Sequence, residues 1–520
     1  MAKKITFIVF LGLFNSLVFS SESKELNETI VRFHENPAAV LNELPAKTPQ
    51  VGDESMLDYM VSPFGQKPLD LGDLIVIKDQ GRSIICKVKD GIRICATDDQ
   101  GRAGILSNDR FENLVDENPN AIRTLEQMDT KNLLKAELSE QPWSDDYWAI
   151  ANGILAHRYA HESGEKNHLW DQAWEKFKDA PTQELLDQGM AYALSPAEKY
   201  DLLVGDKNFT LTRAMFEEGR GYFERNGSVE SWMGICHGWA PAAYMLPRPK
   251  KMVWVKSADG KYDIPFYPSD IKSLGSLLYA KNNSETKFVG GRCNTKDPQK
   301  DENGRVTDQN CFDNNPATWH FAMINQIGVN NRSMVMDATF DYEVWNQPIL
   351  GYELRYFNPD KMTYENNLAD ATTKLGFFNK DKFKKYRDPK TKSIIGIEMK
   401  VKYIVETSPS HNQMDSAHYD GIKAVTYLYD LELDSNGNVI GGEWYSNAHP
   451  DFLWTPVKDS TVTTSTDQYL ASLGVHTWNS ETVVNPAISK FVNYESRRGS
   501  PLALIVNELF KSASGKNKKR

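Results

Sequence analysis

The feature that constrains this chain most is Pro241 in the stretch ESWMGICHGWAPAA. Proline lacks a backbone N–H, so it is tolerated in the first turn of a helix and not deep inside one. A helix in this stretch must therefore begin near His237, which places Cys236 at its N-terminus. The helix dipole and the free N–H groups at that end favour a thiolate. Gly234 and Gly238 would keep bulk away from the sulfur.

The stretch alone leaves two interpretations of Cys236 open, an inert buried thiol or a nucleophile. His237 is next in sequence but points elsewhere, because neighbours one position apart do not face each other on a helix. A catalytic base would therefore have to come from further along the chain.

Length, charge and the first residues exclude some classes of protein. The chain has 520 residues, enough for one large domain and a smaller one. Its net charge of -10 argues against nucleic acid as a partner. Lys3 and Lys4 precede the apolar run ITFIVFLGLF, which is too short to span a bilayer comfortably. We therefore expect residues 1–20 to be a signal peptide, no membrane span elsewhere, and a secreted or periplasmic protein.

The chain has five cysteines, which are able to form disulfides in an oxidising compartment. Cys86 and Cys95 flank KVKDGIRI, and a two-residue Asp-Gly turn would set them directly opposite each other as a non-hydrogen-bonded pair. Cys293 and Cys311 bracket a polar loop that has no apolar period. We expect the disulfides Cys86–Cys95 and Cys293–Cys311, which leaves Cys236 as the free thiol.

The order of the expected elements indicates the α+β class and two units. Residues 21–125 combine a helical beginning with a small β-meander, and this unit is either a pro-region or a permanent domain. Residues 126–500 begin with helices, including SPAEKYDLLVG with Ser195 as its N-cap, and become rich in strands after residue 250. Residues 501–520 are expected to be a tail that ends in the basic run GKNKKR.

A candidate base lies in NPATWHFAMINQIGVNNRSMVMDATF, where two apolar runs flank a Gly- and Asn-containing turn signal. An antiparallel hairpin would bring His320 near Asp337 or, with another turn centre, near Asp341. A histidine oriented by a carboxylate and set against a cysteine at a helix start follows the logic of covalent acyl chemistry. The alternative is that His320 is a core histidine and Asp337 a turn or cap residue.

Several motifs are similar to those of a known family. The order of Cys236, then His320 in Trp-His-Phe, then Asp337 in Asp-Ala-Thr resembles the transglutaminase core. SPAEKYDLLVGD, VESWMGICHGWAPAA, VWNQPILGYELRY and GGEWYSNAHPDFLW resemble the transglutaminase-elicitor family over residues 130–500. The resemblance, and not turn chemistry, selects Asp337 over Asp341. It implies a transglutaminase- or papain-like core in which a helix carries the cysteine and an antiparallel sheet carries the histidine and the aspartate.

The resemblance also bears on recognition by other organisms. The founding members of the family are secreted oomycete enzymes whose surface fragment plants recognise. The stretch from Val344 to Tyr356 resembles that fragment, but it differs at Leu350 and Glu353, where the fragment has basic residues.

The implied activity is that of a protein-glutamine γ-glutamyltransferase whose partners are proteins or peptides bearing glutamine and lysine. Cys236 would attack the carboxamide, His320 would act as base and then acid, and Asp337 would fix its tautomer. The backbone N–H of Cys236 and the indole N–H of Trp232 would hold the oxyanion. The same triad could serve a deamidase or a cysteine protease, and a non-catalytic surface-binding or elicitor protein is the remaining alternative.

The sequence requires no cofactor and offers no clear metal site. The resemblance implies calcium dependence for some family members. DSNGNVIGGE and KDENGRVTD are rich in oxygen ligands, but neither has glycine at the sixth position of an EF-hand loop, and both are expected to be turns.

Overall fold

The computed structural model describes residues 28–41, 74–79, 82–89, 92–96, 104–106, 109–159, 170–282, 284–291, 298–307, 311, 313–338 and 344–515. The expected signal peptide, residues 1–20, lies outside these ranges. Within them, a search of the helices finds none with the length and apolar character needed to cross a membrane.

Helices occur along the whole described part of the chain and are densest between residues 170 and 281 and between residues 465 and 514, whereas the strands that follow residue 285 form most of the main sheet. The helices are α1 (Glu28–Glu35), α2 (Pro37–Leu41), α4 (Leu125–Thr130), α5 (Trp170–Asp179), α6 (Thr182–Asp187), α7 (Pro196–Val204), α8 (Thr210–Asn226), α9 (Cys236–Met245), α10 (Pro268–Lys281), α11 (Pro316–Ala322), α12 (Leu368–Ala371), α13 (Ser465–Ser472), α14 (Pro486–Phe491), α15 (Asn493–Ser496) and α16 (Ala503–Ser514), with a π-helix, η8 (Met323–Val329), directly after α11. The strands are β1 (Leu74–Asp79), β2 (Arg82–Lys89), β3 (Ile92–Ala96), β4 (Lys135–Glu137), β5 (Val253–Lys256), β6 (Asp263–Phe266), β7 (Thr286–Gly290), β8 (Val335–Asp337), β9 (Asn346–Asn358), β10 (Thr363–Glu365), β11 (Thr372–Lys374), β12 (Ser393–Val405), β13 (Gly421–Leu433), β14 (Val439–Trp444) and β15 (Phe452–Pro456).

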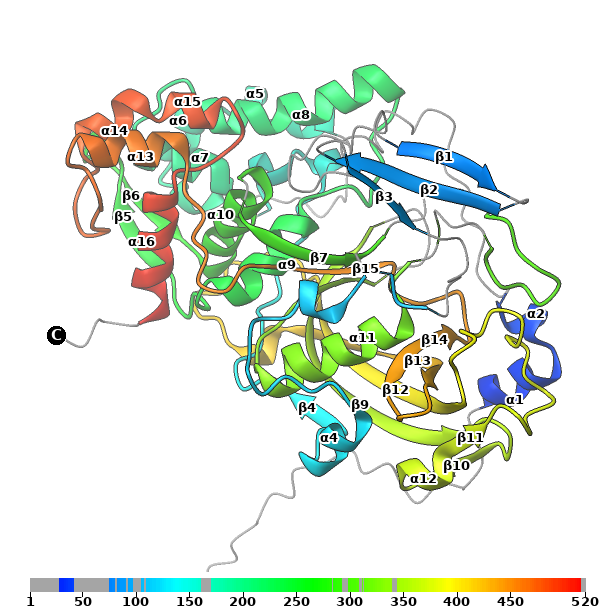
Figure 1. Cartoon of the computed structure of the whole chain (residues 1–520). Coiled ribbons are helices and arrows are strands. Elements are labelled where there is room, and N and C mark those ends of the chain that lie inside the picture. The colour runs from blue at the N-terminus through cyan, green and yellow to red at the C-terminus, as the bar shows by residue number, and fades with distance from the viewer. Residues whose placement is uncertain are drawn as a thin grey trace, which may run out of the picture.

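One large antiparallel sheet forms the frame of the molecule (Figure 1). Its strands follow the order β14-β13-β12-β9-β8-β15-β7. The long hairpin of β12 and β13 pairs Ser393 with Leu433 at one end and Val405 with Gly421 at the other. The β13–β14 pairing confirms the turn expected at DSNGNV, because the two strands run antiparallel on either side of it.

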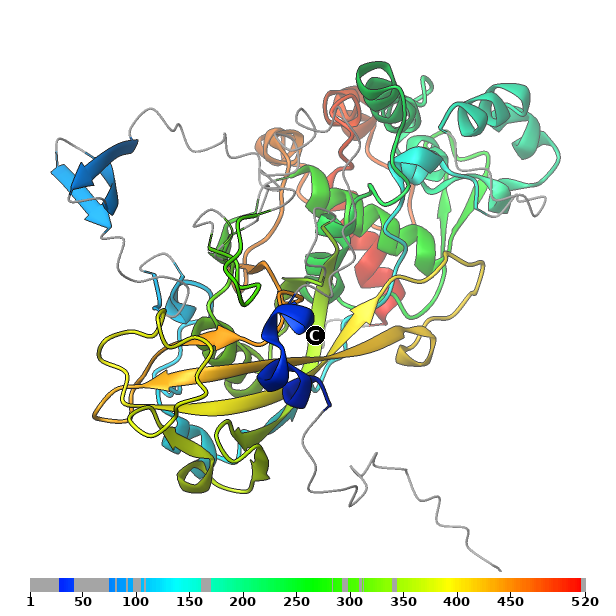
Figure 2. The ribbon, with the colours of Figure 1, turned by 90° about the vertical axis from the view of Figure 1, so that its right-hand side faces the viewer.

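The two faces of the sheet are covered by different helices. Trp319 of α11 meets Tyr427 edge-on, with ring centroids 5.2 Å apart. On the opposite face, Phe33 of α1 stacks on Tyr445 at 4.5 Å. Figure 2 shows the ribbon of α1 and α2, in dark blue, beside the long strands of the sheet. Side chains alternate along a strand, so odd and even positions of β13 contribute to separate cores. The N-terminal helices α1 and α2 therefore pack against the main sheet.

The helical part of the molecule is built around α10, next to α9, α7 and α16 (Figure 1). Lys199 of α7 forms an ion pair of 2.7 Å with Asp270 of α10, and both side chains are fully buried. The start of α7 confirms the sequence prediction, because Ser195 caps the helix in a capping box with Glu198. Helices and antiparallel strands occupy separate regions, which confirms the α+β class.

Residues on both sides of the expected large unit, 126–500, pack into the same core as that unit. Phe111 lies before residue 125, yet it packs on Phe321 of α11 and belongs to the same core as helices of residues 126–500. The segment 501–520 was expected to be a tail, but α16 occupies 503–514. Its Ile505 and Leu509 are fully buried, four residues apart on one helix face.

The strands β1, β2 and β3 form a separate three-stranded antiparallel sheet. In β2 and β3, Cys86 lies directly opposite Cys95, which confirms the register derived from the Asp-Gly turn.

Candidate active site

Cys236 is the first residue of α9, as the position of Pro241 predicted. It is buried, with 5% of its surface exposed, and it is the free cysteine of the described residues. As the first residue of α9, it lies at the end of the helix whose first N–H groups lack acceptors within the helix.

The two glycines beside Cys236 serve close packing of the backbone, which differs from the expected role of leaving space around the sulfur. A Cβ on Gly238 would lie 2.1 Å from the carbonyl oxygen of Ser276 in α10. A Cβ on Gly234 would lie 2.3 Å from the carbonyl oxygen of Tyr147. Both positions therefore require glycine so that neighbouring backbone can approach the helix that carries the thiol.

Asn346, the first residue of β9, and Val344, two residues before the strand, contact the sulfur. The thiol of Cys236 donates to the carbonyl oxygen of Val344 at 3.7 Å, and the Nδ2 group of Asn346 donates to Sγ at 3.7 Å. The Oδ1 atom of Asn346 accepts a 2.8 Å hydrogen bond from the indole N–H of Trp454 in β15. The cysteine is thus held between a helix start and two strands of the main sheet.

Asp337 reaches the same place from β8. It is fully buried and is paired in register with Asn346 of β9. Its Oδ1 atom accepts the backbone N–H of Trp345 at 3.1 Å. Asp337 is also one of the charges that act on Cys236. The alternative partner from the sequence, Asp341, lies outside the described residues.

His320 lies on a helix, so the expected hairpin between two strands is wrong. The first arm is α11 followed by η8, and only the second arm is a strand, β8. Asn315 caps α11 by accepting from the N–H of Ala317, and Pro316 occupies its first position. These are strong signals for a helix start, and they override the apolar run that favoured a strand.

The side chain of His320 is fully buried between α11 and the sheet. Its Nδ1 atom shares a 2.9 Å hydrogen bond with the hydroxyl of Tyr429, and its Nε2 atom has no hydrogen-bond partner among the described residues. Burial lowers the pKa of His320 to about 3, so the ring is neutral. Within the described part of the chain, no hydrogen bond joins His320 to Cys236 or to Asp337.

The indole of Trp232, expected at the oxyanion, takes another partner. Its N–H donates to the carboxylate of Glu230, two residues earlier. The side chain itself is buried, with 9% of its surface exposed.

The electrostatics at the thiol favour its protonated form. The pKa of Cys236 is raised to about 11, mainly by burial; the charges of Glu406 and Asp337 also raise it, and hydrogen bonds from Asn346 lower it. The sequence argument counted the helix dipole and omitted burial in a low-dielectric site. A base must therefore remove the proton before the sulfur can attack.

Glu406, the residue that follows β12, was missed from the sequence. Its Oε1 atom accepts a 2.7 Å hydrogen bond from Nε2 of Gln347 in β9. Burial raises the pKa of this carboxyl group above its usual range. Tyr147 and Trp345 form an aromatic pair beside it, with ring centroids 5.5 Å apart. The motif VWNQP contains four residues of this site, and nothing in the sequence indicates that Val344 and Asn346 are the two that contact the sulfur.

A comparison with family models decides the classification. The model of the transglutaminase elicitor family matches residues 120–483, which is most of the chain. The chain belongs to the transglutaminase elicitor family.

Two further comparisons add little to the assignment. The crystal structure of the GP42 transglutaminase from Phytophthora sojae is similar, with 21% sequence identity, a TM-score of 0.47 and coverage of 76% of this chain and 95% of that chain. A comparison with curated proteins gave no match.

In this family member, the other cysteines are described only in part. Cys311 is disulfide-bonded. Its expected partner, Cys293, lies outside the described residues, so this pairing stays a prediction. Cys86 and Cys95 face each other in the β2–β3 register, and the bond between them also stays a prediction.

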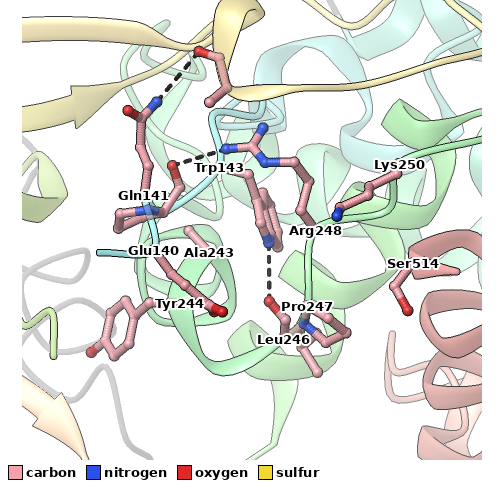
Figure 3. A pocket seen from close by; sticks show the side chains of 12 residues that line it. Glu140, Gln141, Trp143, Ala243, Tyr244, Leu246, Pro247, Arg248, Lys250 and Ser514 are labelled. Atoms are coloured by element: carbon pink, nitrogen blue, oxygen red, sulfur yellow. Dashed lines mark hydrogen bonds between the residues drawn. The ribbon is translucent and has the colours of Figure 1, made fainter. Parts of the chain in front are cut away.

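A pocket of about 250 Å³ lies at the other end of α9, lined by Trp143, Tyr244 and Arg248 among others (Figure 3). Arg248 is paired with Asp415 and Asp420. The ten residues of α9 span about 15 Å, so this pocket is separate from the thiol.

The residues described do not fit a calcium site of the kind that the family resemblance raised. Among them, no group of three or more His, Cys, Asp or Glu side chains is placed to hold a metal ion. Asp301 and Asp434, from the two oxygen-rich loops, instead accept backbone N–H groups of their own turns.

Proposed function

We propose that this protein is a protein-glutamine γ-glutamyltransferase that uses Cys236 as its nucleophile. The observation that carries the proposal is the buried free thiol at the start of α9, contacted by Asn346 and close to Asp337. Membership of a family described as transglutaminase elicitors supports the same chemistry. A thiol at a helix start is a suitable nucleophile for acyl transfer.

The proposed reaction has two halves. In the first, Sγ of Cys236 attacks the carboxamide carbon of glutamine, the C–N bond breaks, and ammonia leaves with the proton taken from the thiol. In the second, a lysine amine attacks the thioester, the C–S bond breaks, and an isopeptide bond forms while the sulfur regains a proton. A general base must act in each half, because both the thiol and the ammonium are protonated at neutral pH.

Two residues are candidates for the base, His320 and Asp337. His320 is the base that the family resemblance implies, and it would need to leave Tyr429 and approach the sulfur. Asp337 is already a charged neighbour of Cys236. Comparing His320→Ala with Asp337→Asn in the same assay separates the two. A large loss of transfer activity in His320→Ala supports the triad, whereas a loss confined to Asp337→Asn assigns the proton transfer to Asp337.

The surroundings of the thiol favour a cationic amine as the second substrate. Glu406 presents a carboxylate, and Gln347 beside it has a buried Oε1 atom with no hydrogen-bond partner among the described residues. Both groups accept hydrogen bonds, which is what the three N–H donors of a lysine ammonium require. This supports transfer over the alternatives of deamidation and proteolysis, for which water is the acceptor.

We also propose that the protein is exported, with residues 1–20 as its signal peptide. The bonded state of Cys311 fits an oxidising compartment. Residues 21–125 remain a candidate pro-region, and a shorter form that begins near Leu133 tests this by its rate of thiol labelling. The packing of α1 on Tyr445 predicts that the shorter form loses stability.

The deciding experiment supplies a glutamine donor peptide and a labelled primary amine. Labelled product together with free ammonia means transfer, ammonia alone means deamidation, and neither product favours a binding protein. The matched control is Cys236→Ala, which removes one sulfur atom and should abolish both signals while the thermal transition stays near that of the wild type. Product formation by this variant would refute Cys236 as the nucleophile.

A further inference from the structure

Asn346 is fixed in the orientation that points its amide N–H group at the sulfur. Its Oδ1 atom accepts from the indole N–H of Trp454 at 2.8 Å, and an indole nitrogen is a donor only. The oxygen must therefore face Trp454, which leaves Nδ2 on the side of Cys236, 3.7 Å from Sγ. Asn346 and Trp454 are both buried, at 5% and 2% exposure, so water does not compete for these groups.

This residue also contributes through its backbone. Hydrogen bonds from the backbone and from the side chain of Asn346 both lower the pKa of Cys236, against burial and the charges of Glu406 and Asp337, which raise it. No arginine, lysine or histidine is among the groups that set this pKa most strongly. The negative charge of a thiolate at this site thus depends on N–H donors for its stabilisation.

The expected donor at this site has another partner. The indole of Trp232 donates to Glu230, so a role in holding the oxyanion would require that bond to break. The amide of Asn346 needs no rearrangement, because it already touches the reacting atom.

We propose that Asn346 is a catalytic residue whose amide stabilises negative charge on the sulfur of Cys236 and on the substrate oxyanion that forms beside it. Trp454 is the positioning residue that orients this amide. The proposal rests on the proposed function for the oxyanion, but its claim about the thiolate stands without it. Preorganised N–H donors in a buried site are effective because they need no reorganisation during the reaction.

The test measures the reactivity of the thiol separately from transfer. The full chain is alkylated with iodoacetamide at pH 8, and labelling of Cys236 is followed by mass spectrometry over time. Below the thiol pKa the rate is proportional to the thiolate fraction, so a pKa rise of one unit slows labelling about tenfold. Asn346→Asp removes the N–H donor and adds a negative charge, and we expect at least this tenfold loss. Asn346→Ala should give a smaller loss in the same direction.

Asn358→Asp is the matched control. Asn358 lies at the other end of β9, is equally buried at 3% exposure, and donates from Nδ2 to the carbonyl oxygen of Asp370. This variant should disturb the strand to a similar extent and leave the labelling rate of Cys236 unchanged. A purely structural role for Asn346 would make the two variants alike.

Trp454→Phe tests the positioning role and serves as a second route if Asn346→Asp does not fold. Phenylalanine retains most of the ring but cannot donate to Oδ1, so the amide is no longer held and labelling should slow several-fold. An unchanged labelling rate in Asn346→Ala and Trp454→Phe would overturn the proposal.

Transfer assays then separate this inference from the proposed function. If the wild type transfers amines, Asn346→Ala should lower kcat about 10²-fold or more with a smaller change in KM. If the wild type shows no transfer while the labelling shifts are found, the proposed function fails and the role of Asn346 toward the thiolate holds.

Discussion

Two buried polar regions on the same sheet differ in how their charges are matched. On the face of the sheet that α1 covers, Arg387 is 4% exposed and pairs with Asp430, Asp381 and Glu432. At the thiol, Glu406 is instead hydrogen-bonded to the neutral amide of Gln347.

This difference in charge pairing indicates that the first region contributes to the stability of the fold and the second to the reactivity of the thiol. The carboxylates around Arg387 have a cation at contact distance, which offsets the cost of burying them. At Cys236 the hydrogen-bond partners are neutral groups, and the pKa of the thiol moves far from its usual value. Burial also raises the pKa of Glu432, beside Arg387, to about 7, so the two regions differ in the charge of their contact partners and not in the size of the pKa shift. We therefore expect substitutions in the first region to change folding and substitutions in the second to change chemistry.

The largest expected effect on stability is that of Arg387→Met. Removing the guanidinium leaves three buried carboxylates without their cation, so the free energy of unfolding should fall by about 3–5 kcal/mol. Urea denaturation measures this loss, and transfer activity per folded molecule should stay near that of the wild type. A loss of less than about 1 kcal/mol is typical of exposed ion pairs, and it would contradict the expectation that the buried pairs of Arg387 stabilise the fold.

Asp337→Asn should do the reverse. The substitution keeps the shape of a fully buried side chain, so we expect a modest effect on unfolding but a fall in kcat of about 10²-fold or more if the carboxylate assists proton transfer. Since the charge of Asp337 raises the pKa of Cys236, its removal should also speed alkylation at pH 8. Slower transfer together with faster labelling is the signature of this role, and slower labelling would contradict it.

Glu406→Gln should have a smaller effect, on the amine substrate alone. Loss of an interaction of about 1 kcal/mol with the ammonium would raise KM for the amine about fivefold, with little change for the glutamine donor. Because burial raises the pKa of Glu406, the wild type should converge on the variant as falling pH protonates this carboxyl group. Equal KM values for the amine in both proteins near neutral pH would remove Glu406 from the acceptor site.

The smallest effect is expected for Lys402→Ala, which serves as the control for the Arg387 variant. Lys402 and Glu137 form an ion pair of 2.7 Å, but their side chains are 46% and 53% exposed. Exposed pairs contribute less than about 1 kcal/mol, so the unfolding midpoint should barely move and activity should not change. A loss comparable to that of Arg387→Met would show that burial does not govern the contribution of charge pairs in this protein.

Local rules predicted the features that depend on neighbours in sequence. Pro241 located the start of α9 within one residue, and the Asp-Gly turn set Cys86 opposite Cys95. Ser195 and Pro196 located the start of α7. The same rule applied to Asn315 and Pro316 would have placed His320 on a helix, and the apolar pattern was weighted above it.

The parts that could not be predicted depend on contacts between distant segments. Cys236 and Asn346 are 110 positions apart, and only the order of β8, β9 and β15 brings that amide and Trp454 together at the sulfur. Burial of the thiol likewise follows from the packing of several elements. The helix-start argument therefore predicted the position of Cys236 correctly but not the direction of its pKa shift.

The contact between Gly238 and Ser276 leaves room for only a hydrogen atom, so the helix that carries Cys236 is fixed against α10. The proposed function requires this thiol, which is only 5% exposed, to meet the side chain of a second protein. Under that proposal the site would open on the opposite side, where the carbonyl oxygen of Val344 contacts the sulfur. Entry of a glutamine would then displace the segment before β9, and the sulfur would stay covered until a substrate arrives.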